Sequence, residues 1–211
     1  MYIAIEGAIG VGKTTLSRLL APTLKADLLL EIFEENPFLA DFYKDRKAYA
    51  FQTQIFFLLS RYHQQKKVAN LLEENDRLIA DYTFEKDALF AGLNLDGDEL
   101  KTYHSVHAAL AEKLEIPDLI VYLRAETDVL MQRIAHRDRP YERNMERDYI
   151  DNLNKAYEKF FTSPPSGMTV LPIDTNTLNY VASPEDLTWV ENRIRQVLKI
   201  PPFQSTLTLE D

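Results

Sequence analysis

Short runs of apolar residues alternate with longer segments of mixed polarity along this chain. The apolar runs lie at Tyr2 to Ile5, Leu28 to Leu30, Leu78 to Ala80, Leu119 to Leu123 and Thr169 to Ile173. Continuous apolar runs of this length are typical of strands buried on both faces of a parallel sheet. The segments between them are long enough for helices, which predicts right-handed crossovers. The expected fold class is therefore α/β, with a doubly wound, five-stranded parallel sheet flanked by helices.

The longest helical segment follows the second predicted strand. Neither Gly nor Pro occurs from Phe38 to Ala91, and Tyr49 to Glu73 is rich in Phe, Leu, Gln and Lys. Because Gly and Pro are the strongest helix breakers, this segment is predicted to be one long helix. A chain of 211 residues with 45% hydrophobic residues fits one domain, expected over residues 1–200, with a tail over 201–211.

Composition narrows the possible partners. The net charge of -9 repels nucleic-acid backbones and anionic membrane surfaces, so neither is an expected partner. A small anionic ligand held in a local cationic pocket is more consistent with this charge. The chain has no cysteine and no run of about 18 apolar residues, so it is expected to work in the cytoplasm.

A glycine-rich motif follows the first predicted strand. Residues 7–14 read GAIGVGKT, which matches the phosphate-binding P-loop pattern between a strand and a helix. In this context the backbone N–H groups converge on phosphate oxygens, Lys13 reaches the β and γ phosphates, and the Thr14 hydroxyl is available to Mg²⁺. ATP and Mg²⁺ are the expected cofactors, held by Gly7, Ala8, Ile9, Gly10, Val11, Gly12, Lys13, Thr14 and Thr15.

A second metal ligand is expected at the end of the third strand. Asp81 directly follows Leu78 to Ala80, where a Walker B type carboxylate lies in parallel sheets. By itself, the same residue is equally suited to cap the N-terminus of the following helix. The DxxG and [NT]KxD motifs of GTP switches do not occur in the sequence.

Several motifs together resemble those of the deoxynucleoside kinases, particularly the bacterial deoxyadenosine and deoxyguanosine kinases. Besides the P-loop they are EIFEENPFLADFYKD (31–45), FQTQIFFLLSRY (51–62), IADYTFEKD (79–87), YLRA (122–125) and RIAHRDR (133–139), followed by DYIDNLNKAYEKF (148–160). The resemblance implies a P-loop kinase fold with a small helical lid at about residues 133–147. It also implies a homodimer that transfers the γ-phosphoryl group of ATP to the 5′-hydroxyl of a deoxynucleoside in nucleotide salvage.

By this resemblance, Glu31 is the general base that takes the proton of the 5′-hydroxyl. An attacking alcohol needs a carboxylate within hydrogen-bond reach, although positioning matters more than basicity when the transition state is loose. Glu34 and Glu35 are rival candidates in the same segment.

The nucleobase is expected to bind on one face of the long helix. Gln54 and Arg61 are seven residues apart and share that face with Phe57, which can form a wall for the base. Gln52, the competing glutamine, lies on the other side of the helix. Asp87 corresponds to the family carboxylate that accepts from an exocyclic amine or fixes the arginine. For each polar residue alone, a solvated helix face is the simpler interpretation.

The sugar is expected to bind next to Tyr43. This tyrosine corresponds to the family residue that hydrogen-bonds the 3′-hydroxyl, and Asp148 matches its carboxylate partner, with Glu146 as the alternative. Tyr82 stands where many members carry an arginine that holds the base and the γ-phosphate, so another group must supply that cation.

Three arginines resemble the lid residues that close over the phosphates: Arg133, Arg137 and Arg139. Their charge is what the transition state requires locally. The alternative is a solvated helix paired with Asp138, Glu142 and Glu146. Asp174 begins a segment that weakly resembles the loop around the donor base.

Two other functions remain open at this point. A nucleoside monophosphate kinase related to thymidylate kinase would need arginines that hold an acceptor phosphate. A non-catalytic ATP-binding regulatory module would bind ATP without nucleoside-stimulated turnover. The resemblance implies a purine deoxynucleoside as the substrate. Because Gln54 can turn its amide, the residues alone leave deoxyadenosine, deoxyguanosine and deoxycytidine open.

Overall fold

Five parallel strands form one sheet in the order β2-β3-β1-β4-β5 in the computed structural model, which describes residues 1–32, 36–165 and 167–202. All four strand pairings are parallel. The strands are β1 (Tyr2–Glu6), β2 (Asp27–Leu29), β3 (Leu78–Ala80), β4 (Leu119–Arg124) and β5 (Val170–Asp174). Each lies on a predicted apolar run to within one residue, so the α/β fold with a five-stranded parallel sheet is confirmed.

The sheet places β1 at its centre, with every residue of that strand buried. The chain adds β3 and β2 on one side of β1, and β4 and β5 on the other. In open parallel sheets, the crevice at such a reversal of strand order, outside the carboxyl ends of the strands, is where ligands bind. The loop that leaves β1 at Glu6 enters this crevice.

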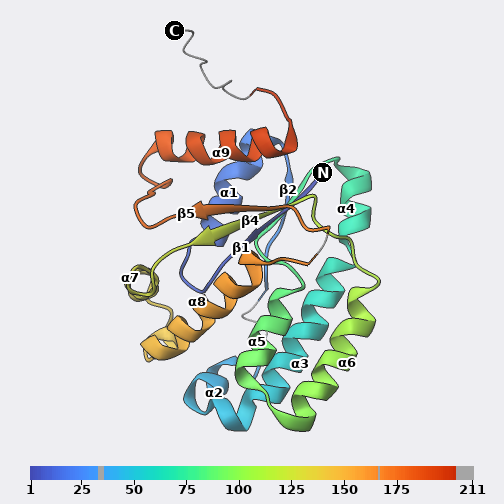
Figure 1. Ribbon diagram of the computed structural model, residues 1–211, viewed down its shortest axis with the longest axis vertical. Helices are drawn as coiled ribbons and strands as arrows, with labels where there is room; N and C mark the ends of the chain where they lie inside the picture. Colours follow the sequence, from blue (N-terminus) through green and yellow to red (C-terminus); the bar gives the residue numbers. More distant parts are fainter. Residues whose placement is uncertain (33–35, 166, 203–211) are drawn as a thin grey trace.

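Helices cover both faces of the sheet (Figure 1). Helices α1 (Lys13–Leu24) and α9 (Pro184–Leu198) lie on one face. The helices that extend from the other face are α3 (Arg46–Gln65), α5 (Lys86–Asn94), α6 (Gly97–Ala111) and α8 (Arg147–Thr162). The remaining helices are α2 (Leu39–Lys44), α4 (Val68–Glu74), α7 (Thr127–Arg137) and the short 3-10 helix η1 (Pro140–Glu142).

The prediction of one long helix over Tyr49 to Glu73 is wrong at its C-terminal third. Helix α3 ends at Gln65, and a turn over Lys66 and Lys67 separates it from α4. The turn lets Val68 pack, fully buried, in a small cluster with Tyr2 and Leu78 of the sheet. Tertiary packing against the sheet thus ends the helix where the sequence contains no Gly or Pro.

The segment from α7 to α8 has the position expected for the lid. Helix α7 ends at Asp138, which has a left-handed backbone with φ 46°, and Pro140 begins η1 two residues later. Because these breaks follow each other closely, the chain folds back toward the P-loop side of the sheet. The predicted division into one domain and a tail stays a prediction, since only residues 201–202 of the tail are described. Among the described residues, no helix combines the length and apolar character needed to span a membrane.

Candidate active site

The P-loop connects β1 to the N-terminus of α1. Gly7 has φ 145°, and a Cβ atom there would lie 2.4 Å from the Leu123 carbonyl oxygen, so only glycine suits this turn. Gly12 precedes α1 with φ 106° and no side-chain cap, so the first amide groups of the helix remain available to an anion. The Lys13 ammonium donates to the Gly7 carbonyl at 2.7 Å and so lies inside the curve of the loop.

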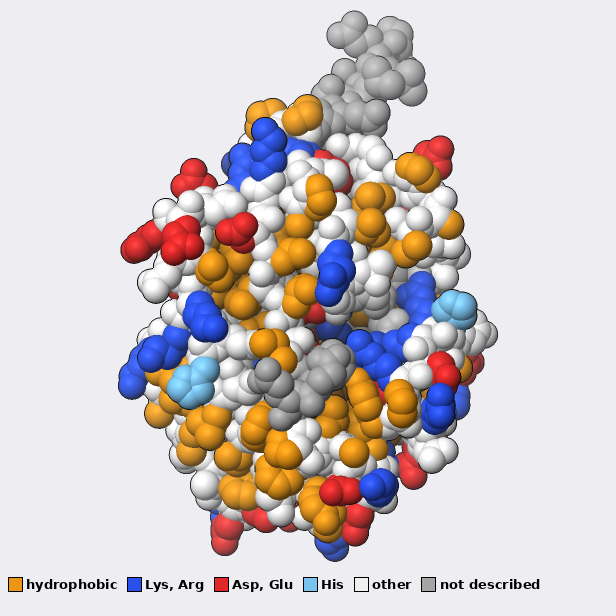
Figure 2. Space-filling view, turned by 180° about the vertical axis from the view of Figure 1, so that it is seen from behind, with side chains coloured by type: hydrophobic (Ala, Val, Ile, Leu, Met, Phe, Trp, Pro, Cys, Tyr) orange, Lys and Arg blue, Asp and Glu red, His pale blue; other side chains and the backbone are white. Residues whose placement is uncertain are grey.

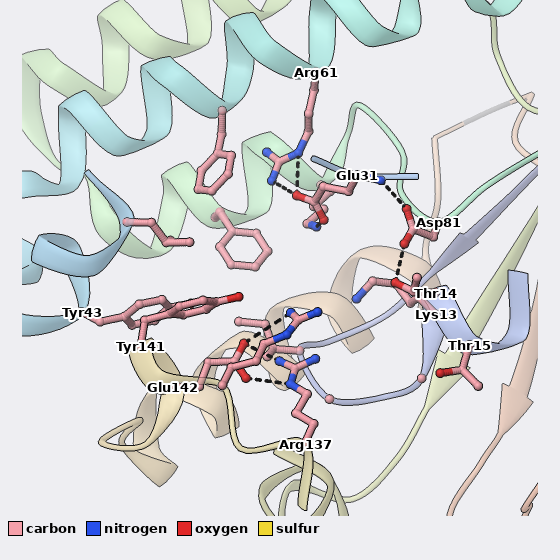
Figure 3. A pocket seen from close by; sticks show the side chains of 18 of the residues that line it. Lys13, Thr14, Thr15, Glu31, Tyr43, Arg61, Asp81, Arg137, Tyr141 and Glu142 are labelled. Carbon is pink, nitrogen blue, oxygen red and sulfur yellow. Dashed lines mark hydrogen bonds and ion pairs between the residues drawn. The ribbon is translucent and has the colours of Figure 1, made fainter. Parts of the chain in front are cut away.

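A cavity of about 370 Å³ opens in front of this loop (Figure 3). Most of the residues predicted for the site meet there. Those that line the cavity are Ile9, Gly10, Gly12, Lys13, Thr14, Thr15, Glu31, Tyr43, Gln54, Phe57, Arg61, Asp81, Arg137 and Arg139. The cavity is also lined by Leu39, Lys86, Phe90, Tyr141 and Glu142, which sequence reasoning did not assign to the site.

Asp81 lies directly beside the P-loop. Its Oδ2 accepts a hydrogen bond from the Thr14 hydroxyl, and its Oδ1 accepts from the Glu31 backbone N–H at 2.7 Å. Asp81 is not the cap of the following helix, because α5 begins at Lys86 with Glu85 as its N-cap residue. A hydroxyl and a carboxylate in contact are hard oxygen donors of the kind that Mg²⁺ prefers. This donor set therefore fits a magnesium ion held mainly by water and phosphate oxygens.

Glu31 is held between two cations. Arg61 donates from Nε and Nη2 to its Oε1, the Nε contact being 3.0 Å long, and the Lys86 ammonium donates to its Oε2 at 2.5 Å. Burial by itself would raise the pKa of this carboxyl group, but Arg61 and Lys86 outweigh that effect and hold the pKa well below its usual range. Glu31 is consequently ionised at neutral pH and faces the cavity as a fixed acceptor. The rivals Glu34 and Glu35 lie outside the described residues.

The electrostatic environment of Lys13 is also unusual. Burial and the neighbouring charge of Lys86 lower the pKa of the Lys13 ammonium to about 8, although Glu6, Glu31 and Asp81 act in the opposite direction. Two ammonium groups thus share one cavity, which favours an anionic ligand between them.

The face of α3 that was predicted to hold a base does face the cavity. Gln54 is only 2% exposed, and its carbonyl oxygen has no hydrogen-bond partner among the described residues. The Arg61 guanidinium lies 4.6 Å from the centre of the Phe57 ring. Asp87 is fully buried and forms an ion pair with Arg61, so in this structure it fixes the arginine and does not itself line the cavity. The competing Gln52 is exposed.

The carboxylates predicted to pair with Tyr43 do not lie in the cavity. Asp148 is exposed in the first turn of α8, and Glu146 is an exposed residue paired with Arg46. Glu142 lines the cavity instead and is 5% exposed, because the turn at η1 directs it inward before α8 begins. Asp148, and Glu146 as its alternative, therefore do not line the cavity as predicted, and Glu142 is the carboxylate of this segment that does.

Tyr43 is fixed by an aromatic neighbour on the lid. Its ring stacks on that of Tyr141, with 6.0 Å between the ring centres and 14° between the planes. Figure 3 shows the two stacked rings at one end of the cavity and Glu31 with Arg61 at another. The Tyr43–Tyr141 stack thus connects helix α2 to the lid.

The three predicted lid arginines do not lie together. Arg137 donates to both carboxylate oxygens of Glu142, at 2.6 and 2.5 Å, and an Arg139 nitrogen lies 3.8 Å from the same carboxylate. Arg133 instead donates to the Val11 carbonyl and to Thr175, outside the cavity. The expectation that all three cover the phosphates is wrong for Arg133 in this structure, because its guanidinium fastens α7 to the back of the P-loop.

Two further residues predicted for the site, Tyr82 and Asp174, do not line the cavity. Tyr82 is fully buried outside the cavity, because its hydroxyl donates to the side-chain oxygen Oε1 of Gln64 on α3 at 2.9 Å. Its assignment to the substrate is therefore wrong. Asp174 is exposed at the end of β5, and its carboxylate accepts from the Asn176 backbone N–H. No described contact joins Asp174 to the P-loop, so its role with the donor base stays a prediction.

Comparison with known proteins agrees with this geometry. A family model described as deoxynucleoside kinase matches residues 3–199. The chain belongs to the deoxynucleoside kinase family. A deoxyguanosine kinase of Bacillus subtilis (strain 168) is 33% identical over 201 residues, which cover 93% of this chain and 97% of that protein. A deoxyadenosine kinase of Dictyostelium discoideum is 36% identical over 165 residues, which cover 75% and 66% of the two chains.

A solved structure is also similar to this kinase. It is a deoxyadenosine kinase from M. mycoides with dCMP and a flexible dCDP bound as products, and it matches with a TM-score of 0.82 and 29% sequence identity. The match covers 93% of this kinase and all of that chain. Together with the family match, the similarity confirms the P-loop kinase fold and the function as a deoxynucleoside kinase.

The kinase concentrates positive charge at the site despite its acidic composition. Figure 2 shows Lys and Arg side chains beside a hollow near the middle of one face, while acidic side chains are spread around the periphery. Lys13, Lys86, Arg137 and Arg139 all line the cavity. A local cationic pocket of this kind is suited to a phosphate-bearing ligand, even in a chain whose net charge is -9.

Sequence reasoning missed Lys86, Tyr141 and Glu142, each for a different reason. Glu142 was considered only as a partner in a solvated salt bridge, although Pro140 two residues earlier signalled a break that could turn it inward. For Lys86 there was a weaker signal, since a lysine in the first turn of a helix opposes the helix dipole. No local pattern indicates the stacking of Tyr141 on Tyr43, because it depends on how the lid docks.

Proposed function

We propose that this kinase transfers the γ-phosphoryl group of ATP to the 5′-hydroxyl of a purine deoxynucleoside and forms the 5′-monophosphate for nucleotide salvage. The observation that carries the proposal is the common cavity of Lys13 and Glu31, which extends to Gln54 and Arg61. A triphosphate bound on the P-loop and a nucleoside bound along α3 would meet at the Glu31 carboxylate. The acceptor atom there is an uncharged alcohol.

In the proposed transfer, the 5′-oxygen forms a bond to the γ-phosphorus while the bond from that phosphorus to the bridging oxygen of ADP breaks. The 5′-hydroxyl proton passes to Glu31. Because the pKa of Glu31 is low, its main contribution is to orient the hydroxyl, which is what a loose transition state requires. Lys13, Arg137 and Arg139 supply positive charge to the phosphoryl oxygens. When bound at Thr14 and Asp81, Mg²⁺ would neutralise phosphate charge.

The base end of the cavity supports a purine substrate. The side-chain amide of Gln54, whose oxygen has no hydrogen-bond partner among the described residues, is available to the base edge, and the Phe57 ring on the same face of α3 is available for stacking. Sequence identity does not distinguish deoxyadenosine from deoxyguanosine as the substrate. The chain is 36% identical to a relative named deoxyadenosine kinase and 33% identical to one named deoxyguanosine kinase.

The sugar end supports recognition of the 3′-hydroxyl. Tyr43 and Glu142 both line this part of the cavity, so a hydroxyl between them could donate to the carboxylate and accept from the phenol. Arg137 and Arg139 also contact Glu142, so the same carboxylate would connect the sugar to the lid arginines.

Neither alternative function is favoured by a specific contact. A monophosphate kinase would need a free arginine for the acceptor phosphate, but Arg61 at the acceptor end is already paired with Glu31 and Asp87. A regulatory module would not need a carboxylate aimed into the cavity. The magnesium ion, the homodimer and the cytoplasmic location stay predictions.

A substrate panel tests the proposal. Purified enzyme with ATP and Mg²⁺ is given deoxyadenosine, deoxyguanosine, deoxycytidine, thymidine or deoxyadenosine monophosphate, and ADP formation is recorded. We expect a purine deoxynucleoside to give a kcat/KM at least about 10-fold above that of thymidine, since one well-placed hydrogen bond is worth about that factor. Turnover with the monophosphate alone would support the thymidylate kinase type. ATP binding without turnover would support the regulatory module.

A further inference from the structure

Lys86 lines the same cavity as Lys13 and Glu31, and the transfer described above gives it no role. It is the first residue of α5, and its side chain is only 7% exposed. Its ammonium donates to Glu31 Oε2 at 2.5 Å, while Arg61 takes Oε1. Each oxygen of the carboxylate thus has its own cation.

The position of Lys86 is electrostatically costly. The first turn of a helix carries partial positive charge, so a lysine there is disfavoured, and a second ammonium, that of Lys13, shares the same cavity. A residue needed only to fill space at this point would not require a charge. The ion pair with Glu31 offsets this cost, and a second anion in the cavity, such as a phosphate, would offset it further.

Arg61 cannot neutralise Glu31 alone. Its guanidinium is shared with the fully buried Asp87, so two carboxylates face one arginine. Lys86 supplies the missing positive charge. Any change that neutralises Glu31 therefore leaves Lys86 as an unpaired cation next to the site of phosphoryl transfer.

On the basis of the proposed function, we propose that Lys86 is a catalytic cation that moves from Glu31 to the transferred phosphoryl group. Before reaction, its ammonium fixes the carboxylate toward the 5′-hydroxyl. As the 5′-oxygen bonds to phosphorus, its proton passes to Glu31, and the neutral acid no longer holds Lys86. The ammonium then donates to a phosphoryl oxygen while the bond to ADP breaks, and after product release Glu31 returns the proton to water. The ammonium itself keeps its protons throughout.

Kinetics of Lys86 variants provide the first test. The exposed Lys101, which pairs with Asp98 on α6, is the matched control position for Lys→Met. We expect Lys86→Met to lower kcat at least about 100-fold, the effect of removing one donor that stabilises transition-state charge, with the KM for the deoxynucleoside changed less than about 3-fold. The kcat of Lys86→Arg should be at least about 10-fold higher than that of Lys86→Met. The kcat of Lys101→Met should equal that of the wild type.

A second variant separates charge from hydrogen bonding and covers the case in which Lys86→Met does not fold. Lys86→Gln can still donate a hydrogen bond to Glu31 but carries no charge. We expect its kcat to be as low as that of Lys86→Met. A kcat within about 5-fold of the wild type would overturn the proposal, because a purely positioning hydrogen bond would then suffice.

The movement of the cation has its own binding test. In Glu31→Gln the neutral amide should release Lys86, so the ratio of ATP to ADP affinity in the presence of Mg²⁺ should rise at least about 3-fold. The double variant Glu31→Gln with Lys86→Met should lose that rise. An equal ratio in the single and double variants would mean that Lys86 does not meet the γ-phosphoryl group, and would overturn the proposal.

These outcomes are separate from those of the proposed function. If the wild type forms no ADP with any deoxynucleoside, the proposed function fails whatever Lys86 does. If the wild type is active and Lys86→Met is as active as Lys101→Met, the inference about Lys86 fails and the proposed function stands.

Discussion

At the scale of single residues, the site is organised by ion pairs, and those of Glu31 join residues that are 30 and 55 positions apart in the sequence. Glu31 with Arg61 and Lys86, and Glu142 with Arg137, are the main examples. These pairs are buried or half-buried, so removing one partner leaves a charge that water only partly solvates. These ion pairs thereby fix the orientations of the Glu31 and Glu142 carboxylates.

Glu142 gives a prediction about the sugar. Changing Glu142 to Gln should raise the KM for the deoxynucleoside about 10-fold, since a hydrogen bond to a charged group is worth about 1.5–3 kcal/mol. The measurement is steady-state kinetics, with the exposed Asp148→Asn as the control. With a 2′,3′-dideoxynucleoside, which has no 3′-hydroxyl, the wild type and Glu142→Gln should have the same KM. If the KM of Glu142→Gln is still 10-fold higher with this substrate, Glu142 acts through the lid arginines and does not bind the 3′-hydroxyl.

The residue-level predictions from sequence succeeded where a local pattern carried the information. The P-loop spacing placed Lys13 and Thr14, and helical periodicity placed Gln54, Phe57 and Arg61 on one face that does line the cavity. Sequence reasoning failed for Glu142 because a 3-10 turn, not a periodic element, sets its direction. It failed for Tyr82 because the position of a residue in a motif does not fix the direction of its side chain, which here contacts Gln64.

At the scale of elements, the turn between β1 and α1 is the most constrained part of the site. Gly12 has φ 106°, and a Cβ atom there would lie 2.2 Å from the Tyr180 hydroxyl oxygen. The loop after β5 thus packs closely over the P-loop. The P-loop motif predicts a glycine at position 12, but no pattern in the sequence predicts its contact with Tyr180.

Substitution of Gly12 by Ala should therefore destabilise the fold by about 2 kcal/mol or more, because the backbone strain and the collision add. The matched control is Gly92→Ala in α5, where a Cβ atom has no neighbour within 4 Å. That change should be neutral or stabilising by up to about 1 kcal/mol, since alanine is the better helix former. Urea unfolding of both variants measures the difference. Equal stabilities would show that the P-loop can relax around a side chain.

The break between α3 and α4 cannot be predicted from helix propensity. Nothing in the sequence near Lys66 and Lys67 predicts an end, yet burial of Val68 against the sheet is favourable enough to turn the chain. The strands were predictable because each is a short apolar run buried on both sides. The position of α5, and with it the direction of Lys86, follows only from the assembled sheet and helices.

At the scale of the whole molecule, the chain is acidic, but a cavity lined by several lysines and arginines lies where the strand order of the sheet reverses. The central β1 leads the P-loop into the cavity, while β2 and β3 end near Glu31 and Asp81. The residues of the base end come from α3, and the lid closes the sugar end. Three separate parts of the chain are thereby brought to one site by the order of the strands.

The central claim is that the carboxylate of Glu31 orients a deoxynucleoside 5′-hydroxyl for attack and receives its proton. Its most direct test is the single-turnover rate of phosphoryl transfer by Glu31→Gln with ATP, Mg²⁺ and the best substrate of the panel, next to Glu99→Gln, an exposed position in α6. The account predicts that the Glu31 variant binds ATP but transfers the phosphoryl group at least about 100-fold more slowly, with the Glu99 variant unchanged. A rate within about 3-fold of the wild type would contradict it.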